Sequence, residues 1–291
     1  MSKSFEKLKL FHPCFSVGEK SNNGRVHLPV SPGCNISCNF CERKINDIDL
    51  RPGVASAIIS PEEAVEVVRK AVELCPDITV AGVAGPGDTL VTPYALQTFR
   101  LIKHEFPHII KCMSTNGLLL PDYADEIIGV GIDSLTVTVN AVDSAIEAEI
   151  CESVSYHGVR YEGEEAAVIL IKNQLDGIRK VSTAGVTVKV NTVLIPEINA
   201  SHVDEVAKAV SEAGAKIYNI IPLIPQHKLS WCSAPSCELI SDTREKAEEY
   251  IKVFRHCQRC RADAAGIPGG TDVSRKLYIR PVRMENTFSH G

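Results

Sequence analysis

Residues 25–41 read RVHLPVSPGCNISCNFC, an apolar and β-branched run that leads directly into three closely spaced cysteines. The run as far as Val30 is typical of a buried parallel strand. Cys34, Cys38 and Cys41 follow with the spacing C-x3-C-x2-C, on the loop that leaves this strand. Because active sites of (β/α) barrels lie where the strands end, the stretch predicts an α/β fold and the position of its chemistry.

Five similar runs follow along the chain, separated by helical patterns. Six strand–helix units predict a parallel sheet but are too few for a closed eight-stranded barrel. We therefore expect a partial (β/α)6 TIM-like barrel. A doubly wound sheet is the alternative, but no G-x-G-x-x-G motif follows the first strand. The predicted strands are residues 25–30, 78–84, 109–114, 134–140, 187–195 and 217–224.

Helix start and stop signals fit this alternation. Ser60 can cap a helix that opens with Pro61 and two acidic residues. Gly185 and Gly214 are placed to end two later helices. The predicted helices are residues 61–75, 93–105, 122–129, 164–184, 201–213 and 241–256.

The chain length of 291 residues suits one substantial core, and we expect a single domain over residues 1–265. N- and C-terminal extensions should cap the open end of the barrel. Residues 266–291 turn glycine-rich and then basic, which indicates a flexible tail or lid.

Charge and hydropathy argue against two classes of partner. The net charge of -5 implies no basic surface, so nucleic acid is not expected. No apolar run reaches the roughly 18 residues that a membrane-spanning helix needs. The N-terminus also lacks the apolar core of a secretory signal, so we expect a cytoplasmic protein.

The 11 cysteines are an odd number in a chain without a secretory signal, which argues against disulfides. Core thiols, zinc and iron–sulfur ligation remain. Three thiolates can hold three corners of a four-iron cluster, which leaves the fourth iron free to bind the amino and carboxylate groups of S-adenosylmethionine (SAM). Structural zinc sites usually take two C-x2-C pairs, so the triad fits zinc poorly.

Polar residues follow four further predicted strands. The second strand ends in AGPGD, where glycines let the backbone approach a ligand such as the SAM amino group. Side chains at the next three strand ends could bind the ribose or carboxylate, and an aromatic ring in the triad could pack near the adenine. Each alone is more often a turn residue, but their shared register favours a site. The predicted SAM-binding residues are Phe40, Gly85, Gly87, Asp88, Ser114, Thr115, Asn116, Asn140 and Asn191.

Further thiols lie outside the triad. Cys257 and Cys260 form a C-x2-C pair at the end of predicted helix 241–256, which is half of a metal site. His27 lies within the first strand, where a histidine is usually structural, although imidazole is a competent iron ligand. Lone cysteines are usually inert small hydrophobes, the role expected for Cys75 and Cys151.

Longer motifs carry more information than the triad. They are HPCF, GRVHLPVSPGCNISCNFC, RPGV, AGPGD, STNGL, TVTVNAVD, NTVLIPEIN and CQRCRADAAG, and they extend from His12 to about residue 268. The triad resembles the signature of the radical SAM superfamily, and the whole set resembles the NifB family of nitrogenase iron–molybdenum cofactor biosynthesis proteins. Many members carry a further C-terminal cofactor-binding domain, so this chain is similar to the stand-alone form.

The resemblance implies a carbide-forming reaction on iron–sulfur clusters. Two [4Fe–4S] substrate clusters would be fused with a SAM-derived carbon and an extra sulfur into an [8Fe–9S–C] cofactor precursor. One SAM would methylate a cluster sulfide, and a second would yield a 5′-deoxyadenosyl radical that takes hydrogen from that methyl group. The implied anchors of the substrate clusters are Cys14, His27, Cys112, Cys257 and Cys260. The implied partners are iron–sulfur cluster donor proteins, a cofactor scaffold or carrier, and an electron donor such as ferredoxin or flavodoxin.

The chain departs from the family pattern just after the triad. Glu42 stands where asparagine is expected, and it could supply a carboxylate or shuttle protons, so it joins the triad as a predicted catalytic residue. Asn46 stands where many relatives have another cysteine close by.

Two other functions are compatible with the motifs. One is a different radical SAM enzyme with auxiliary clusters, such as a peptide maturase, although maturases usually carry more than one C-x2-C near the C-terminus. The other is a non-catalytic iron–sulfur scaffold, which would not need SAM.

Overall fold

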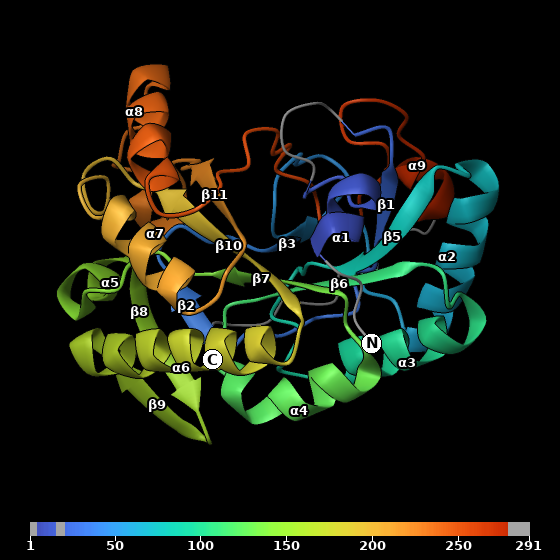
Figure 1. Cartoon of the computed structure of the whole chain (residues 1–291), viewed down its shortest axis with the longest axis horizontal. Helices are drawn as coiled ribbons and strands as arrows, with labels where there is room; N and C mark the ends of the chain where they lie inside the picture. The colour runs from blue at the N-terminus through green and yellow to red at the C-terminus, as the bar shows by residue number, and fades with distance from the viewer. Residues whose placement is uncertain (1–4, 16–20, 279–291) are drawn as a thin grey trace.

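The computed structural model describes residues 5–15 and 21–278, and a curved parallel sheet forms its centre (Figure 1). The strand order β11-β10-β7-β6-β5-β1-β12 keeps the six parallel strands in their sequence order. All six predicted strands are present, and the predicted partial (β/α)6 barrel is confirmed. The strands are β1 (Gly24–His27), β5 (Ile78–Val83), β6 (Ile110–Thr115), β7 (Ser134–Thr138), β10 (Thr187–Leu194), β11 (Ile217–Pro222) and the antiparallel β12 (Ala265–Gly266).

Successive residues of each strand point to opposite faces of the sheet. In β6, Met113 packs into the main hydrophobic core, whereas Cys112 and Ser114 face the interior of the barrel. Val188 and Val190 of β10 likewise belong to the core. One face of the sheet therefore stabilises the fold, and the other is free to carry chemistry.

An outer layer of helices covers the core face of the sheet (Figure 1). Ser60 caps α2 through a reciprocal capping box with Glu63, an arrangement worth about 1 kcal/mol. Gly185 and Gly214 follow α6 and α7 with φ of 88° and 104°, as the stop signals predict. The layer consists of α2 (Pro61–Leu74), α3 (Tyr94–Glu105), α4 (Leu120–Val130), α6 (Gly163–Thr183), α7 (Val203–Glu212) and α8 (Cys237–Glu248).

The predicted helix over residues 241–256 is wrong at both ends. Ser236 caps α8 earlier, because its hydroxyl accepts from the Leu239 amide at 3.1 Å. Beyond the helix the chain extends beside β11, where the Phe254 amide donates to the Tyr218 carbonyl at 2.7 Å. Cys257 and Cys260 consequently lie on a loop rather than at a helix end.

Residues 266–278 differ from the flexible tail that the composition predicts. β12 pairs with β1 in antiparallel register, which extends the main sheet. Val273 and Tyr278 are buried, and the Tyr278 hydroxyl donates to the His27 carbonyl. This part of the chain is packed against the barrel, whereas residues 279–291 of the predicted tail lie outside the described residues.

The N-terminal extension closes the end of the barrel where the strands begin. Helix α1 (Phe5–Phe11) lies in front of the sheet in Figure 1. Leu8 and Phe15 are fully buried and belong to a cluster with residues near the starts of three strands and one following α8. These partners are Val80, Ile110, Ile217 and Phe254.

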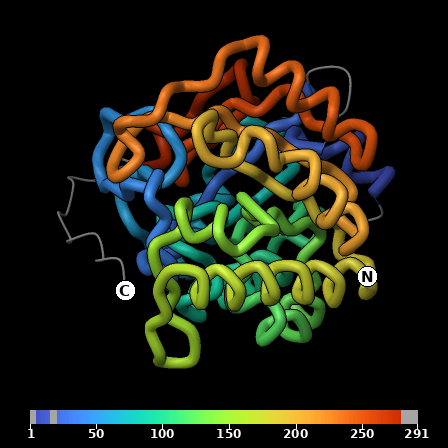
Figure 2. Tube along the Cα trace, turned by 90° about the vertical axis from the view of Figure 1, so that its left-hand side faces the viewer, coloured from blue at the N-terminus to red at the C-terminus, as the bar shows by residue number. Residues whose placement is uncertain are grey.

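Short elements around the triad were not predicted. β2 (Ile36–Cys38), β8 (Cys151–Tyr156) and β9 (Val159–Glu162) form a small antiparallel sheet, whose hairpin projects past α6 in Figure 2. The other short elements are β3 (Lys44–Ile45), β4 (Val54–Ala55), α5 (Ser144–Ile150), a 3-10 turn (His227–Leu229) and α9 (Ser274–Leu277). Within residues 5–15 and 21–278, every helix is too short or too polar to cross a bilayer.

Candidate iron–sulfur and SAM site

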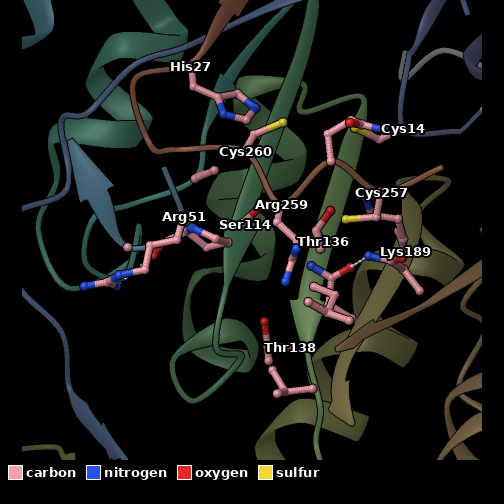
Figure 3. Close-up of a pocket in the computed structure, with 18 of the residues that line it drawn as sticks. Cys14, His27, Arg51, Ser114, Thr136, Thr138, Lys189, Cys257, Arg259 and Cys260 are labelled. Carbon is pink, nitrogen blue, oxygen red and sulfur yellow. Dashed lines mark hydrogen bonds between the residues drawn. The ribbon is translucent and has the colours of Figure 1, made fainter. Parts of the chain in front are cut away.

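A cavity of about 330 Å³ occupies the interior of the barrel. Alternate residues of the strands form one part of its wall, and the triad loop, the segment around Cys14, the residues after β11 and the loop after α8 form others (Figure 3). The strand residues in the wall are Arg25, His27, Val80, Cys112, Ser114, Thr136, Thr138, Lys189, Asn191, Val193, Asn219, Ile221 and Pro222.

The triad cysteines lie on the segment that leaves β1. Cys38 ends β2, and the Cys41 amide donates to the Cys38 carbonyl at 3.0 Å, which folds the segment back on itself. All three thiols are half-buried and free of disulfides, and Cys41 lines the cavity directly. Burial, assisted by the nearby Asp88 carboxylate, raises the pKa of the Cys34 thiol to about 11. Cluster binding must therefore release a proton from this thiol.

The glycine-rich turn after β5 supports the triad loop from behind. A Cβ on Gly87 would lie 2.0 Å from the Gly33 carbonyl oxygen, so only glycine allows this approach. Asp88 is buried and accepts from the Asn116 amide at 2.6 Å and the Thr115 hydroxyl at 2.9 Å. The turn thus joins the ends of β5 and β6 to the cysteine loop.

The predicted SAM-binding residues divide into two groups. Phe40, Ser114 and Asn191 line the cavity, where they can contact a ligand. The side chains of Asn116 and Asn140 instead brace neighbouring loops. Asn116 donates to the Asn35 side-chain oxygen at 2.7 Å, and Asn140 accepts from the Val193 amide at 3.0 Å. Gly85, Gly87, Asp88 and Thr115 are likewise absent from the cavity wall.

All five predicted anchors of substrate clusters line this one cavity, although they come from four separate parts of the chain (Figure 3). Cys14 follows α1, His27 ends β1 and Cys112 lies in β6, while Cys257 and Cys260 belong to the loop after α8. The Arg25 guanidinium lies 3.1 Å from the Cys260 sulfur. The barrel therefore gathers thiols that sequence spacing alone could not place together.

Burial sets the protonation of these groups. It raises the pKa of Cys14 to about 11, and it raises the pKa of Cys112 as well. Burial and the neighbouring Arg25 charge lower the pKa of His27 to about 4. His27 is therefore a neutral imidazole at pH 7, with one ring nitrogen held 3.0 Å from the Arg261 carbonyl. A neutral imidazole can bind iron without first losing a proton.

Glu42 also lines the cavity, as one of the predicted catalytic residues. Its carboxylate pairs with Lys44 at 3.1 Å and lies 3.7 Å from Arg51. Asn46 is absent from the cavity wall and instead forms a turn, because its side-chain oxygen accepts from the amides of Ile48 and Asp49 at 2.9 Å.

The sequence interpretation missed the positive charge of the cavity. Arg25, Arg51, Lys189 and Arg259 all line it. Strand alternation was the available signal for Arg25 and Lys189, since each lies two residues from an inward-facing neighbour. Cys151 was also underestimated: although buried like Cys75, it lies opposite Cys38 in the strand pair and raises the pKa of the Cys38 thiol.

The triad suits a four-iron cluster. Within the described ranges, no three His, Cys, Asp or Glu side chains converge closely enough to hold one metal ion. A four-iron cube does not require such convergence, because each thiolate binds a different iron. The three thiols lie within eight residues of one loop, and the Arg43 charge favours the thiolate forms of Cys34 and Cys41. These features suit a [4Fe–4S] cluster with one open corner.

Solved structures share this fold. The chain is similar to a radical SAM methyltransferase from Sphaerobacter thermophilus, with a TM-score of 0.59 and 17% identity over 82% of this chain and 69% of that one. It is also similar to Streptococcus suis SuiB bound to S-adenosylmethionine, with a TM-score of 0.53 and 14% identity over 84% and 49% of the two chains.

Sequence comparisons are more specific. The profile of the Radical SAM superfamily matches residues 28–210. The FeMo cofactor biosynthesis protein NifB of Methanocaldococcus jannaschii is 45% identical over 99% of this chain and 96% of its own length. The Klebsiella pneumoniae protein of the same name is 43% identical, over 89% of this chain and 57% of its own. The chain therefore belongs to the NifB family of the radical SAM superfamily.

Proposed function

We propose that this protein forms the carbide-containing precursor of the nitrogenase iron–molybdenum cofactor. Its substrates would be two [4Fe–4S] clusters, SAM and an additional sulfur, and its product an [8Fe–9S–C] core. The similarity to proteins named for FeMo cofactor biosynthesis supports the pathway. The observation that supports the reaction is one cavity lined by Cys41 of the triad and by the five side chains that are predicted to anchor substrate clusters.

Cys34, Cys38 and Cys41 would hold the resident cluster. With SAM bound, this cluster would supply the electron for sulfonium cleavage, and SAM would supply the carbon. Phe40, which lines the cavity next to Cys41, offers an aromatic face for the adenine. The Ser114 hydroxyl and the Asn191 amide offer hydrogen bonds to the ribose or carboxylate.

The substrate clusters would be held by Cys14, Cys112, Cys257 and Cys260 together with His27. Five side chains are fewer than the eight corners of two cubes, so at least one substrate cluster would be bound incompletely. Incomplete ligation suits a substrate that must fuse and leave. The neutral His27 side chain adds no charge and exchanges readily, which suits the same purpose.

Glu42 would accept a proton when the SAM-derived carbon loses its hydrogens. Its side chain is about two-fifths exposed and faces both the cavity and solvent, so a proton can leave through it. Glu42→Gln should lower the yield of the fused core about 100-fold while leaving methyl transfer intact. An unchanged yield would exclude this role.

One experiment tests the proposal as a whole. Anaerobic reconstitution should give about twelve irons per chain, and incubation with SAM and dithionite should give both S-adenosylhomocysteine and 5′-deoxyadenosine. Cys38→Ala should abolish both products while sparing most auxiliary iron. Cys75→Ala, which alters a buried core thiol outside the cavity, is the matched control. Iron that never exceeds about four per chain would contradict the proposal.

The same proposal requires partners. Iron–sulfur cluster donor proteins would supply the substrates, ferredoxin or flavodoxin the electrons, and a cofactor scaffold or carrier would accept the product.

A further inference from the structure

The interior of the barrel is positively charged although the protein as a whole is acidic. The net charge of the chain is -5. Arg25, Arg51, Lys189 and Arg259 nevertheless line the cavity, and Glu42 is the one carboxylate in the part of its wall that the structure describes. Such an imbalance favours an anionic occupant.

Lys189 is the most deeply placed of these cations. The residue is 6% exposed and projects from the middle of β10 into the cavity (Figure 3). Its ammonium group lies 5.7 Å from the centre of the Phe15 ring and 5.6 Å from that of Phe254. Aromatic faces offset only part of the cost of removing an ammonium group from water.

Carboxylates near the barrel interior are engaged elsewhere. Asp133 pairs with Lys111 at 3.2 Å, and Asp263 pairs with Arg261 at 2.8 Å. Among the described residues, no ion pair includes Lys189. Burying an ammonium group without a carboxylate partner costs folding free energy. A charged lysine at position 189 therefore requires a negative charge from another source.

Three of the five predicted cluster anchors lie within electrostatic reach of Lys189. Beyond the larger effect of burial, its charge lowers the pKa values of Cys14 and Cys112, and also those of His12 and His27. Two of these are thiols that ligate iron only as thiolates. Lys189 therefore favours the ligating form of each thiol and faces the space that a cluster would fill.

We propose that Lys189 is the counter-charge of the fused iron–sulfur core and holds it without a covalent bond. This inference rests on the proposed function for the identity of the occupant. The two cubes gain a sulfide dianion and a methyl cation, and then lose two protons and a neutral hydrogen atom, so the total charge of the merged core is more negative than that of its substrates. The electrons that reduce the carbon to carbide come from the cluster irons. A fixed ammonium group therefore binds the product more strongly than the substrates. The Lys189 ammonium group can hold the product while the thiolate ligands dissociate from it. The thiolates alone could not hold a product that they are releasing.

The test compares Lys189→Met with Lys189→Arg in the full-length protein, and Lys208→Met on the exposed face of α7 is the surface control. After reaction with SAM and dithionite, desalting should remove the fused core about tenfold more readily from Lys189→Met, equivalent to about 1.4 kcal/mol. Lys189→Arg should retain it like the parent protein. Equal retention by Lys189→Met would overturn the inference.

A second readout is independent of carbide formation. In the Cys38→Ala background without SAM, the reduction potential of the auxiliary clusters should fall in Lys189→Met, because a fixed positive charge stabilises the reduced form. Lys189→Gln also removes the charge but keeps a polar side chain, so its reduction potential should fall as in Lys189→Met. Agreement between the two variants shows that the change does not come from the packing of methionine. An unchanged potential in both variants would contradict the counter-charge role. A lowered potential in a protein that makes no fused core would refute the proposed function alone.

Discussion

Cys38 on β2 and Cys151 on β8 stand opposite each other in an antiparallel strand pair, and the adjacent Cys151 thiol, together with burial, raises the pKa of Cys38. Cys151 is fully buried, and its sulfur also lies 3.4 Å from the Ser153 carbonyl. The strand register fixes the Cys151 thiol beside a sulfur that is proposed to bind the resident cluster. Cys151 therefore contributes to the surroundings of that cluster without being one of its ligands.

The first prediction concerns this sulfur pair. Once Cys38 binds iron as a thiolate, its sulfur can only accept, and the neighbouring Cys151 thiol can turn its S–H from the Ser153 carbonyl toward it. Such a hydrogen bond stabilises the reduced cluster, so Cys151→Ala should lower the reduction potential of the SAM-binding cluster. Cys151→Ser keeps a donor and should restore part of the difference. Redox titration followed by electron paramagnetic resonance measures the effect, and iron content should stay unchanged. Identical potentials in all three proteins would show that Cys151 is only a packing residue.

A second prediction follows from the space beside His27. A Cβ added at Gly82 would lie 3.2 Å from Cδ2 of the His27 ring and 3.7 Å from its Nε2. Gly82→Ala should therefore displace the imidazole at a cost of about 1 kcal/mol in folding stability. The nitrogen hyperfine coupling of an auxiliary cluster in the Cys38→Ala background should weaken.

Gly129→Ala is the control for this substitution, because a Cβ there meets nothing within 4 Å. Its spectrum should match that of the parent protein. An unaltered nitrogen coupling in Gly82→Ala would argue against His27 as an iron ligand.

The third prediction treats Asp88 as a brace. Its buried carboxylate accepts from the backbone amides of Asn116 at 2.6 Å and Leu90 at 2.9 Å, and from the Thr115 hydroxyl. Asp88→Ala leaves these donors without a hydrogen-bond acceptor, which should lower the free energy of unfolding by about 1–3 kcal/mol for each donor. Thr115→Val removes the bond that its hydroxyl donates to Asp88 and the bond that it accepts from the Gly117 amide, and should cost about 1 kcal/mol for each. Urea unfolding of the cluster-free protein measures both, and equal stability of Asp88→Ala and the parent protein would refute the brace.

Local patterns were enough to predict the barrel. The β-branched runs predict strands, and the residues around Ser60 predict a helix start, each from only a few neighbouring residues. The folded structure contains both kinds of element where they were predicted. His27 and Cys112 also face inward, as their predicted roles require. These features depend on neighbours that are close in sequence.

Features that depend on distant partners could not be predicted. The pairing of Cys38 with Cys151 joins segments more than a hundred residues apart. The place of Asp88 at a strand end predicts a ligand-binding residue. In the structure, however, three groups donate hydrogen bonds to its carboxylate, which therefore braces the neighbouring loops. Lys189 was overlooked because a lysine in a strand is usually exposed, whereas this strand lines a closed interior.

The last prediction concerns Glu147 in α5, which is 1% exposed and has one carboxyl oxygen without a hydrogen-bond partner. Burial, with a smaller effect of Cys151, raises the pKa of Glu147 well above its ordinary value of 4.5. A raised pKa in the folded state means that its contribution to stability is complete below pH 4.5 and is lost as pH rises through the folded pKa. Over that interval the loss is about 1.4 kcal/mol per pH unit.

Glu147→Gln cannot ionise and should escape this loss. Its stability should match that of the parent protein below pH 4.5 and exceed it increasingly at higher pH. Anaerobic urea unfolding of the cluster-free protein between pH 4.5 and 8 measures the difference. Glu149→Gln, at an exposed position of the same helix, should follow the parent curve. A constant offset between Glu147→Gln and the parent protein at every pH would mean that the substitution acts through packing, because only ionisation of Glu147 makes the difference grow with pH.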